Sequence, residues 1–417
     1  MIQLIKGFKD VLPGEIEVWQ TIERAAKETF ENFGFQEIRL PIVEKSELFS
    51  RSIGDTTDIV EKEMYTFEDG RRGHVTLRPE ATASVVRSYI QHKMYAKDPV
   101  RKFYTIGPMF RRERPQKGRY RQFYQIDAEV FGIDSPYLDA QLIFMLASLL
   151  ERLKAKDVKA HINSLGCPCC RPNFQKALKE LLDAKKEHLC ENCLRRSEKN
   201  PLRVLDCKVP ACREAVVGAP SILDHLCDDC SEHFDTVKRV LTENGVEYEV
   251  NKNLVRGLDY YTRTAFEVLT TSLGAQNAVA GGGRYDGLVK ALGGPEVPAI
   301  GFAIGFDRLA EIVAMQQAIE ANGPTLYIAP LGEKATEAAA HWTMQLTARG
   351  ISCETDFGGR SLKSHMKRAD KLKAAHVLMV GDDELEKGMA TLRNMTTRDQ
   401  RDLPLDGLVE TLAEQFK

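Results

Sequence analysis

The sequence has no apolar run long enough to cross a membrane as a helix. The longest near-continuous run covers residues 142–150, well short of the roughly 20 residues that a spanning helix needs. The N-terminal stretch holds Lys6 and Lys9 where a secretory signal would have its apolar core. We therefore expect a cytoplasmic protein that does not associate with membranes.

An excess of charge of one sign is missing as well. Of the 417 residues, 58 are Lys or Arg and 60 are Asp or Glu, which gives a formal net charge of −2. This balance excludes a uniformly basic nucleic-acid binder, although local basic patches remain compatible with it. The length suggests about three domains, and the sequence has no short-period repeat and no low-complexity tract.

Cysteine is nearly absent outside one segment. Nine of the ten cysteines lie between Cys167 and Cys230, and Cys353 is the exception. Disulfides are disfavoured in a reducing cytosol, so we expect another role for these thiols. Eight of them form four closely spaced pairs: Cys167 with Cys170, Cys190 with Cys193, Cys207 with Cys212, and Cys227 with Cys230.

These eight thiols could form two tetrahedral four-cysteine zinc sites. The spacing does not reveal which pairs combine. The alternative is a small domain with free or partly paired thiols. We favour zinc, because paired Cys-x-x-Cys knuckles would be reactive if they were left as exposed free thiols.

Apolar periodicity predicts a mixture of helices and strands, followed by a linker at Asn322-Gly323-Pro324. Helices are predicted over 15–33, 80–92, 137–153 and 305–315, and strands over 35–43, 102–111, 121–131, 158–163 and 299–304. After the linker, strands over 325–330, 351–355 and 377–380 alternate with helices over 335–349 and 361–372. This alternation predicts a small separate α/β domain.

The predicted strand 121–131 carries an unusual set of side chains on one face. Alternate residues of a strand point to opposite faces, so Ile126, Ala128 and Val130 share a face that suits a core. The other face carries a cation, an aromatic ring, an amide and two carboxylates: Arg121, Phe123, Gln125, Asp127 and Glu129. This face is either the solvated side of an antiparallel sheet or a binding surface.

The loop before this strand is strongly basic. Residues 111–121 contain five arginines, one lysine and one glutamate. Because the planar guanidinium suits phosphate oxygens better than the point charge of lysine does, the loop favours a polyphosphate ligand, an RNA backbone, or both in turn. A merely solvated basic turn is the alternative.

Three further segments are typical of binding sites. Residues 255–261 place Arg256 before Tyr260 and Tyr261, which on a strand would point to opposite faces. The run Gly281-Gly282-Gly283 would let a ligand or another backbone approach closely, although glycine runs are most often turns. Residues 301–309 lead from a strand into a helix with Arg308 in its first turn, where anions are favoured.

Together these segments resemble the histidyl-tRNA synthetases of class II. Residues 33–41 resemble motif 1 of that class, residues 110–125 motif 2 and residues 301–309 motif 3, while 77–82 and 256–261 resemble the two histidine-specific signatures. The resemblance covers nearly the whole chain. It implies an α+β fold, with a class II antiparallel sheet flanked by helices, a cysteine-rich insertion and a C-terminal α/β anticodon-binding domain. The implied domains are a catalytic domain at 1–164 and 249–322, the insertion at 165–248, and the anticodon-binding domain at 325–417.

The resemblance also implies an enzyme that ligates L-histidine to its tRNA through a histidyl-adenylate, with ATP and Mg²⁺ as the substrate complex. Arg111, Arg256 and Arg308 would be the catalytic cations. The histidine site would comprise Glu80, Ala81, Thr82, Arg111, Gln125, Glu129, Arg256, Tyr260 and Tyr261, and the ATP site Arg111, Glu113, Phe123 and Arg308. Contacts to tRNA would come from Gln116, Arg121, Arg360 and Lys363. The enzyme would be a homodimer.

The resemblance does not account for the cysteine segment, so any zinc there would be structural and would lie outside the ATP pocket. Two alternatives from other classes remain. The regulatory paralogue that partners the first enzyme of histidine biosynthesis typically lacks the Arg256 signature and the anticodon domain, both of which are expected here. In a zinc-dependent nucleic-acid-binding protein, the ATP motifs would have no role.

Overall fold

The computed structural model describes residues 1–54, 57, 59–116, 118–258, 260–272, 277–319 and 323–416. Lys117 of the basic loop, Asp259 of the histidine signature and Asn322 of the linker lie outside these ranges. The chain forms two compact units, Met1–Ile319 and Glu320–Lys417. No helix within the described ranges combines the length and the apolar character needed to traverse a bilayer.

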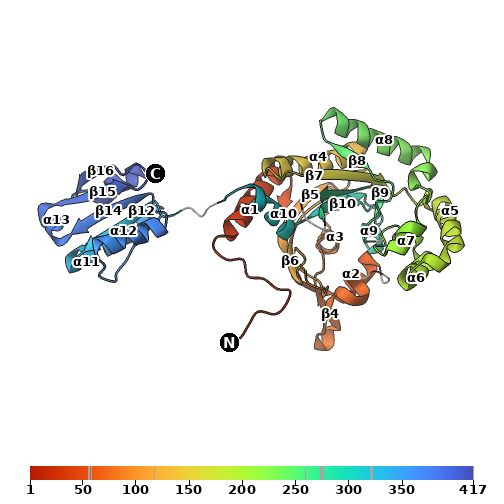
Figure 1. The fold of residues 1–417 in the computed structure, drawn as a ribbon. Coiled ribbons are helices and arrows are strands. Elements are labelled where there is room, and N and C mark those ends of the chain that lie inside the picture. The colour runs from red at the N-terminus through yellow and green to blue at the C-terminus, as the bar shows by residue number, and fades with distance from the viewer. Residues whose placement is uncertain are drawn as a thin grey trace. The chain divides into compact units, whose positions relative to one another are not determined.

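A sheet of eight strands forms the core of the first unit, in the order β1-β5-β6-β11-β10-β9-β7-β8 (Figure 1). The strands are β1 (Gln36–Glu37), β5 (Arg101–Phe110), β6 (Gln122–Phe131), β7 (Val158–Ser164), β8 (Tyr248–Val250), β9 (Thr262–Thr270), β10 (Ala278–Arg284) and β11 (Ala299–Gly305). Neighbours from β5 to β7 pair antiparallel, whereas β1 on β5 and β8 on β7 pair parallel at the two edges. The predicted antiparallel sheet is therefore confirmed for its central six strands.

One face of this sheet packs against four helices, α1 (Ile16–Asn32), α4 (Pro136–Arg152), α8 (Asp228–Glu243) and α10 (Phe306–Gln316). Phe30 of α1, Leu146 of α4 and Ile312 of α10 are buried in one cluster with Ile126 and Ala128 of β6. Burying such side chains contributes roughly 1.5–3 kcal/mol each. This face is the protein's main core, and it leaves the opposite face of β6 for other uses.

The opposite face is covered by α3 (Thr82–Gln91) and the short α9 (Leu288–Ala291). Beside them lies a small sheet in the order β2-β4-β3, built from Val43–Lys45, His74–Leu77 and Tyr65–Glu68. Helix α2 (Ser46–Ile53) and the turns η1 (Ile59–Glu63) and η2 (Gly70–Arg72) complete this region.

The cysteine-rich insertion has a small core of its own. Its elements are α5 (Arg171–Ala184), η3 (Lys186–His188), α6 (Glu191–Lys199), η4 (Pro201–Val204), α7 (Pro210–Ala215), η5 (Ile222–His225) and α8 (Asp228–Glu243). Phe174, Leu178 and Leu182 of α5 are buried together with Cys170 and Cys193. Sulfur atoms thus occupy much of the space that aliphatic side chains fill in an ordinary core.

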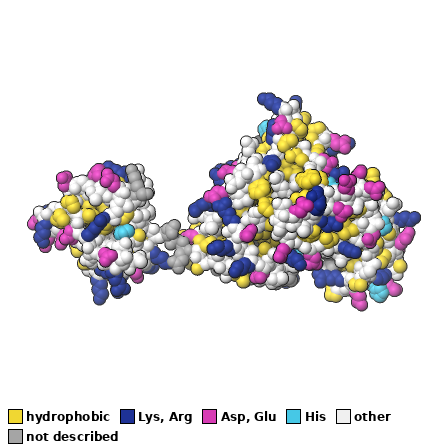
Figure 2. Space-filling model, turned by 90° about the horizontal axis from the view of Figure 1, so that it is seen from above, with side chains coloured by type: hydrophobic (Ala, Val, Ile, Leu, Met, Phe, Trp, Pro, Cys, Tyr) yellow, Lys and Arg dark blue, Asp and Glu magenta, His cyan; other side chains and the backbone are white. Residues whose placement is uncertain are grey.

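The second unit is a five-stranded sheet with helices, in the order β13-β12-β14-β15-β16. Its elements are β12 (Leu326–Leu331), α11 (Glu333–Ala348), β13 (Cys353–Thr355), α12 (Leu362–Lys371), β14 (His376–Gly381), α13 (Asp382–Lys387), β15 (Met389–Asn394), β16 (Gln400–Pro404) and α14 (Leu408–Gln415). Strands β13, β12 and β14 are parallel, as the predicted alternation requires. On the face shown in Figure 2, acidic and basic side chains are interspersed over each unit, which agrees with the net charge of −2.

One prediction about the local structure of the first unit is wrong. The strand expected over 35–43 is limited to β1 and a second short strand beginning at Val43. Between them lies Pro41, which has no N–H to donate to a sheet. The glycine run 281–283 forms the middle of β10, so the alternative of a plain turn does not apply to it.

Candidate active site

A pocket of about 390 Å³ opens on the face of the large sheet that α1 and α4 leave uncovered. Most of the residues predicted for histidine and ATP line it, although they come from five separate stretches of sequence. These are Glu80, Thr82, Arg111, Glu113, Phe123, Gln125, Arg256, Tyr260, Tyr261 and Arg308. The structure therefore gathers into one cavity the segments that the sequence presents far apart.

The side-chain alternation predicted for residues 121–131 is confirmed in β6. Ile126, Ala128 and Val130 are fully buried in the main core, while Phe123, Gln125 and Asp127 line the pocket. The face with mixed chemistry is therefore not a solvated side of the sheet. Arg111 lies over the ring of Phe123 at 5.1 Å from its centroid, so the pocket offers an aromatic surface next to a cation.

Three buried carboxyl groups lie in or behind the pocket wall: Glu80 and Asp127 line the pocket, and Glu129 is bound by the lining residues Thr82 and Tyr285. Burial raises the pKa of Glu80, although the Ala83 N–H and the charge of Arg111 act against this rise. Burial, reinforced by the charges of Glu129 and Glu80, holds the pKa of Asp127 well above its usual range. Neither carboxyl oxygen of Asp127 has a hydrogen-bond partner among the described residues. Such a site suits a ligand with ammonium or imidazole N–H groups, because these donors would satisfy oxygens that are otherwise orphaned.

Glu129 does not line the pocket and is held on two sides. The Thr82 hydroxyl donates to one oxygen at 2.6 Å, and the Tyr285 hydroxyl donates to the other. Burial raises its pKa to about 8, although both hydrogen bonds oppose the shift. On the neighbouring strand Gly301 pairs with Glu129, and a Cβ at Gly301 would collide with the carboxylate. The glycine is therefore needed at this position to leave room for the side chain.

Four arginines give the pocket a basic wall. Arg111, Arg119, Arg256 and Arg308 all line it. Arg111 is fixed by donating to the Pro79 carbonyl at 2.9 Å, and Arg308 by donating to the Gly118 carbonyl at 3.2 Å. Burial lowers the pKa of Arg308, and the charge of Arg119 adds to the effect. A guanidinium stays charged in proteins in spite of such shifts, so these groups form a preorganised anion site.

Arg256 contacts a carboxylate and an aromatic ring. Its guanidinium forms an ion pair with Glu267 of β9 and lies 5.4 Å from the centroid of the Tyr261 ring. A Cβ at Gly281 would collide with this guanidinium. The glycine run in β10 therefore does allow close approach, but the group that approaches here is the Arg256 side chain.

The prediction that Tyr260 and Tyr261 point to opposite faces is wrong, because β9 begins only at Thr262. Their ring centroids are 4.7 Å apart, and both residues line the pocket. The chain before the strand is irregular, so the two-residue periodicity of a strand does not apply there.

Glu129, which binds Thr82, does not line the cavity. Five other residues predicted for histidine or tRNA do not line it either. Ala81 is buried beneath it, and Gln116 forms a bridge with the backbone of Arg119 in the basic loop. Arg121 donates to the carbonyls of Glu113 and Lys6. Arg360 and Lys363 belong to the second unit, where Arg360 pairs with Asp356 at 2.7 Å and Lys363 lies in α12.

Four residues of the site were missed from the sequence: Asp127, Asp206, Glu267 and Tyr285. Asp127 shares the odd-numbered face of β6 with Gln125 and Glu129, so the alternation alone could have included it. Asp206 lies in the insertion, next to Cys207, and nothing in the sequence indicates that it reaches the pocket. None of the eight paired cysteines lines the pocket.

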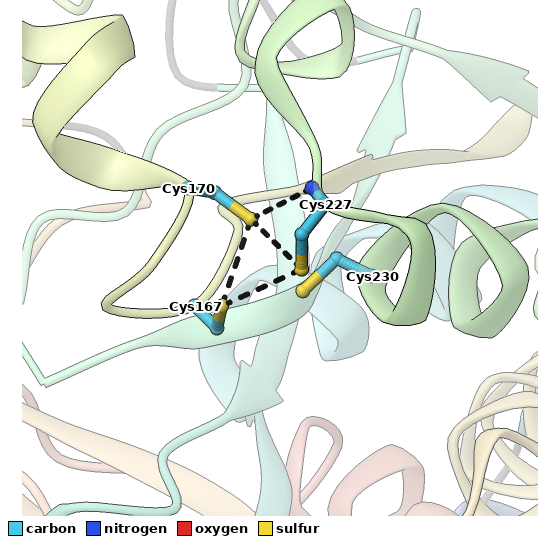
Figure 3. Close-up of side chains that lie close together, drawn as sticks. All are labelled: Cys167, Cys170, Cys227 and Cys230. Atoms are coloured by element: carbon cyan, nitrogen blue, oxygen red, sulfur yellow. Dashed lines mark hydrogen bonds between the residues drawn. The ribbon is translucent and has the colours of Figure 1, made fainter.

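The eight paired cysteines form two clusters, and the structure determines how the pairs combine. Cys167, Cys170, Cys227 and Cys230 form the first, and Cys190, Cys193, Cys207 and Cys212 the second. Within each cluster the four sulfur atoms lie within 4.8 Å of one another. Figure 3 shows the first cluster, in which the loop before α5 and the start of α8 direct four sulfur atoms toward a common centre.

The geometry of the clusters fits a tetrahedral metal site. The sulfur of Cys227 lies 3.8 Å from that of Cys167 and 3.5 Å from that of Cys170. In a tetrahedral site with zinc–sulfur bonds of about 2.3 Å, sulfur atoms lie about 3.8 Å apart. Backbone N–H groups also donate to the sulfurs, as from Cys227 to Cys170 at 3.2 Å and from Cys190 to Cys212 at 3.1 Å. Such donors stabilise thiolates, which are the form that binds metal.

An antiparallel sheet flanked by helices, with arginines around an anion site and a separate α/β unit, defines a class II aminoacyl-tRNA synthetase. Residues 7–309 match the family model described as histidyl-tRNA synthetase, and residues 325–415 match that described as anticodon binding domain. The chain belongs to the histidyl-tRNA synthetase family.

Individual relatives agree with this assignment. The histidine–tRNA ligase of Desulforapulum autotrophicum is 63% identical over 420 residues, covering 100% of this chain and 99% of that protein. That of Desulfatibacillum aliphaticivorans is 60% identical over 413 residues, covering 99% of each. The crystal structure of the apo histidyl-tRNA synthetase of S. aureus has a TM-score of 0.84 and 35% identity, covering 99% of this chain and 100% of that one.

Proposed function

We propose that the pocket described above carries out both steps of the family's reaction, the ATP-dependent ligation of L-histidine to its tRNA. The intermediate is histidyl-adenylate, and the products are AMP and pyrophosphate. The observation that carries this proposal is that one cavity is lined both by the buried carboxyl groups of Glu80 and Asp127 and by four arginines. Histidine with its ammonium and imidazole groups matches the first, and the phosphates of ATP match the second.

In the first step the histidine carboxylate attacks the α-phosphorus of ATP, and pyrophosphate leaves. Negative charge develops on the phosphoryl oxygens, so cations fixed beforehand are the main catalytic resource. Arg111 and Arg256 would hold the α-phosphate and carboxylate, and Arg308 the γ-phosphate. Phe123 would stack on adenine, with Glu113 on the same side of the pocket. ATP would enter as its Mg²⁺ complex.

Histidine would be held by the part of the site that contains the buried carboxyl groups. Glu80, Thr82 and Gln125 would hold the α-ammonium group, with Ala81 shaping the turn that carries them. Glu129 would accept the imidazole N–H, and Tyr260 and Tyr261 would enclose the ring. A buried carboxylate discriminates strongly, because a side chain without an N–H would leave it unpaired.

In the second step the terminal adenosine hydroxyl of the tRNA attacks the adenylate. Gln116 and Arg121 lie in the basic loop and would contact the acceptor end, while Arg360 and Lys363 of the second unit would contact the anticodon. We further propose that the enzyme is a cytoplasmic homodimer. The two alternative functions, a regulatory paralogue and a nucleic-acid-binding protein, leave the buried carboxyl groups of the site without a ligand. Pyrophosphate exchange that depends on histidine separates the proposal from both.

We also propose that each cysteine cluster holds one zinc ion, with a structural role in the insertion. Protein purified without chelator should contain up to two zinc ions per chain. Cys170→Ser should remove one of them, because it deletes a ligand of the first cluster. Cys169→Ser is the matched control and should keep both, since Cys169 is exposed and belongs to neither cluster. Elemental analysis measures the ions, and eight freely titrating thiols in a zinc-free native protein would contradict the proposal.

A further inference from the structure

The insertion forms part of the wall of the catalytic pocket. Asp206 lines that pocket together with Arg256. Leu202 and Arg203 line an adjoining cavity of about 170 Å³, which also has Arg256 and Tyr261 in its wall. The stretch from η4 to Cys207 therefore lies next to the arginine that we place at the α-phosphate, although the cysteines themselves do not line the pocket.

The second cysteine cluster holds this stretch from both of its sides. Cys207 follows Asp206 directly and contributes its sulfur to the cluster. Cys190 and Cys193 lie at the start of α6, from which Arg195 extends to pair with Glu61 at 3.1 Å. Glu61 belongs to the turn η1, whose residue Ile59 also lines the pocket. The cluster thus connects two separate parts of the pocket wall.

Arg256 is a residue whose position such a wall can influence. Its ion pair with Glu267 comes from the floor of the pocket, on β9. Its Nε is buried and has no hydrogen-bond partner among the described residues. The Asp206 carboxylate, on the insertion side, is therefore a second source of negative charge for the Arg256 guanidinium, which otherwise pairs with Glu267 alone.

We propose that the second cluster is a positioning device for the catalytic site: a zinc-type ion on Cys190, Cys193, Cys207 and Cys212 fixes Asp206 in the pocket wall, and Asp206 keeps Arg256 in its working orientation. Without the ion, no metal–sulfur bonds hold the four thiol groups together, and the stretch that ends in Cys207 becomes more mobile. Asp206 is a positioning residue here, since it acts through Arg256. The inference rests on the proposed function, because it concerns the same arginine and the same reaction.

Full-length protein with its metal tests this proposal through histidine-dependent ATP–pyrophosphate exchange and elemental analysis. Asp206→Asn should raise the histidine KM about three- to tenfold, with unchanged zinc content and a smaller change in kcat. Asp224→Asn is the matched control in the same insertion, since Asp224 is exposed and does not line the pocket. Its histidine KM should equal that of the wild type.

Cys207→Ser links the effect to the metal. This variant should lose one zinc ion and show a similar rise in histidine KM. The double variant with Asp206→Asn should show no further rise, because two changes that act through one path are not additive.

Asp206→Asn with an unchanged histidine KM overturns the positioning role even if Cys207→Ser does not fold. A Cys207→Ser variant that loses zinc but keeps its KM overturns the role of the metal. A wild type without histidine-dependent exchange overturns the proposed function, and this inference with it.

Discussion

Arg256→Ala should reduce histidine-dependent ATP–pyrophosphate exchange by about 10²–10³-fold, the usual effect of losing one preorganised contact to developing charge. The guanidinium lies in the pocket, pairs with Glu267 and lies over the ring of Tyr261; the proposed mechanism assigns it to the α-phosphate. No other cation among the described residues occupies this side of the cavity, because Arg111, Arg119 and Arg308 approach from the motif 2 and motif 3 segments. The loss should lower kcat, because the charge that Arg256 stabilises is greatest in the transition state. It should also raise the histidine KM, because Arg256 would hold the histidine carboxylate before the reaction.

The matched control is Arg239→Ala. Arg239 is an exposed arginine of α8 that pairs with Glu243 at 3.1 Å, far from the pocket lining. An exposed pair of this kind contributes about 0–1 kcal/mol to stability, so the control should fold and exchange normally. Near-normal exchange by a folded Arg256→Ala protein would remove Arg256 from the catalytic set.

Glu129→Gln should weaken histidine far more than ATP. The amide is a poorer acceptor for an imidazole N–H than a carboxylate, and the loss of a charged hydrogen bond costs about 1–3 kcal/mol. This corresponds to roughly a 5- to 150-fold rise in the histidine KM. The ATP KM should change little, because the side chains that bind Glu129 are Thr82 and Tyr285 and not the arginines proposed for the phosphates. An unchanged histidine KM would make Glu129 a structural carboxylate of β6.

Glu129→Gln should weaken histidine binding but should stabilise the protein without ligand. The Glu129 carboxyl has a pKa raised by burial to about 8 in the folded chain, against 4.5 as its ordinary value. Between these values the folded chain holds a proton that the unfolded chain has released, so stability falls as pH rises through this window. Glutamine cannot ionise. The melting temperature of Glu129→Gln relative to that of the wild type should therefore rise from about pH 5 to about pH 8 and stay constant at higher pH. The same measurement shows that the variant is folded.

The parts of the fold that could be predicted from sequence are those with a clear local period. Helices α1 and α4 carry apolar stripes at helical spacing, and β6 alternates between core and pocket side chains over its whole length. The single strand predicted over 35–43 is not formed, because Pro41 interrupts it and has no N–H to pair with a neighbouring strand. Strand β16 was missed because four of its five residues are exposed and give little apolar signal. Strand β15 was missed because only two of its six residues, Ala390 and Leu392, are buried.

The residues of the candidate site that could be predicted are those that lie within a sequence motif. Arg111, Arg256 and Arg308 were found in this way, and they line one cavity. Glu267 and Tyr285 were not found, because their roles depend on which strands pair with which, and register between distant strands is set by the whole sheet. Asp206 depends on even more: the insertion must fold around its own cysteines before that side chain can reach the pocket.

The most direct test of the account is ATP–pyrophosphate exchange by the purified full-length protein, measured with each amino acid in turn. Histidine alone should support exchange, because only its side chain offers an imidazole N–H to Glu129 while its ammonium group meets Glu80. Histidinol, which keeps the imidazole and lacks the carboxylate, should bind without supporting exchange. Exchange of equal rate with another amino acid, or no exchange with histidine, would contradict the account.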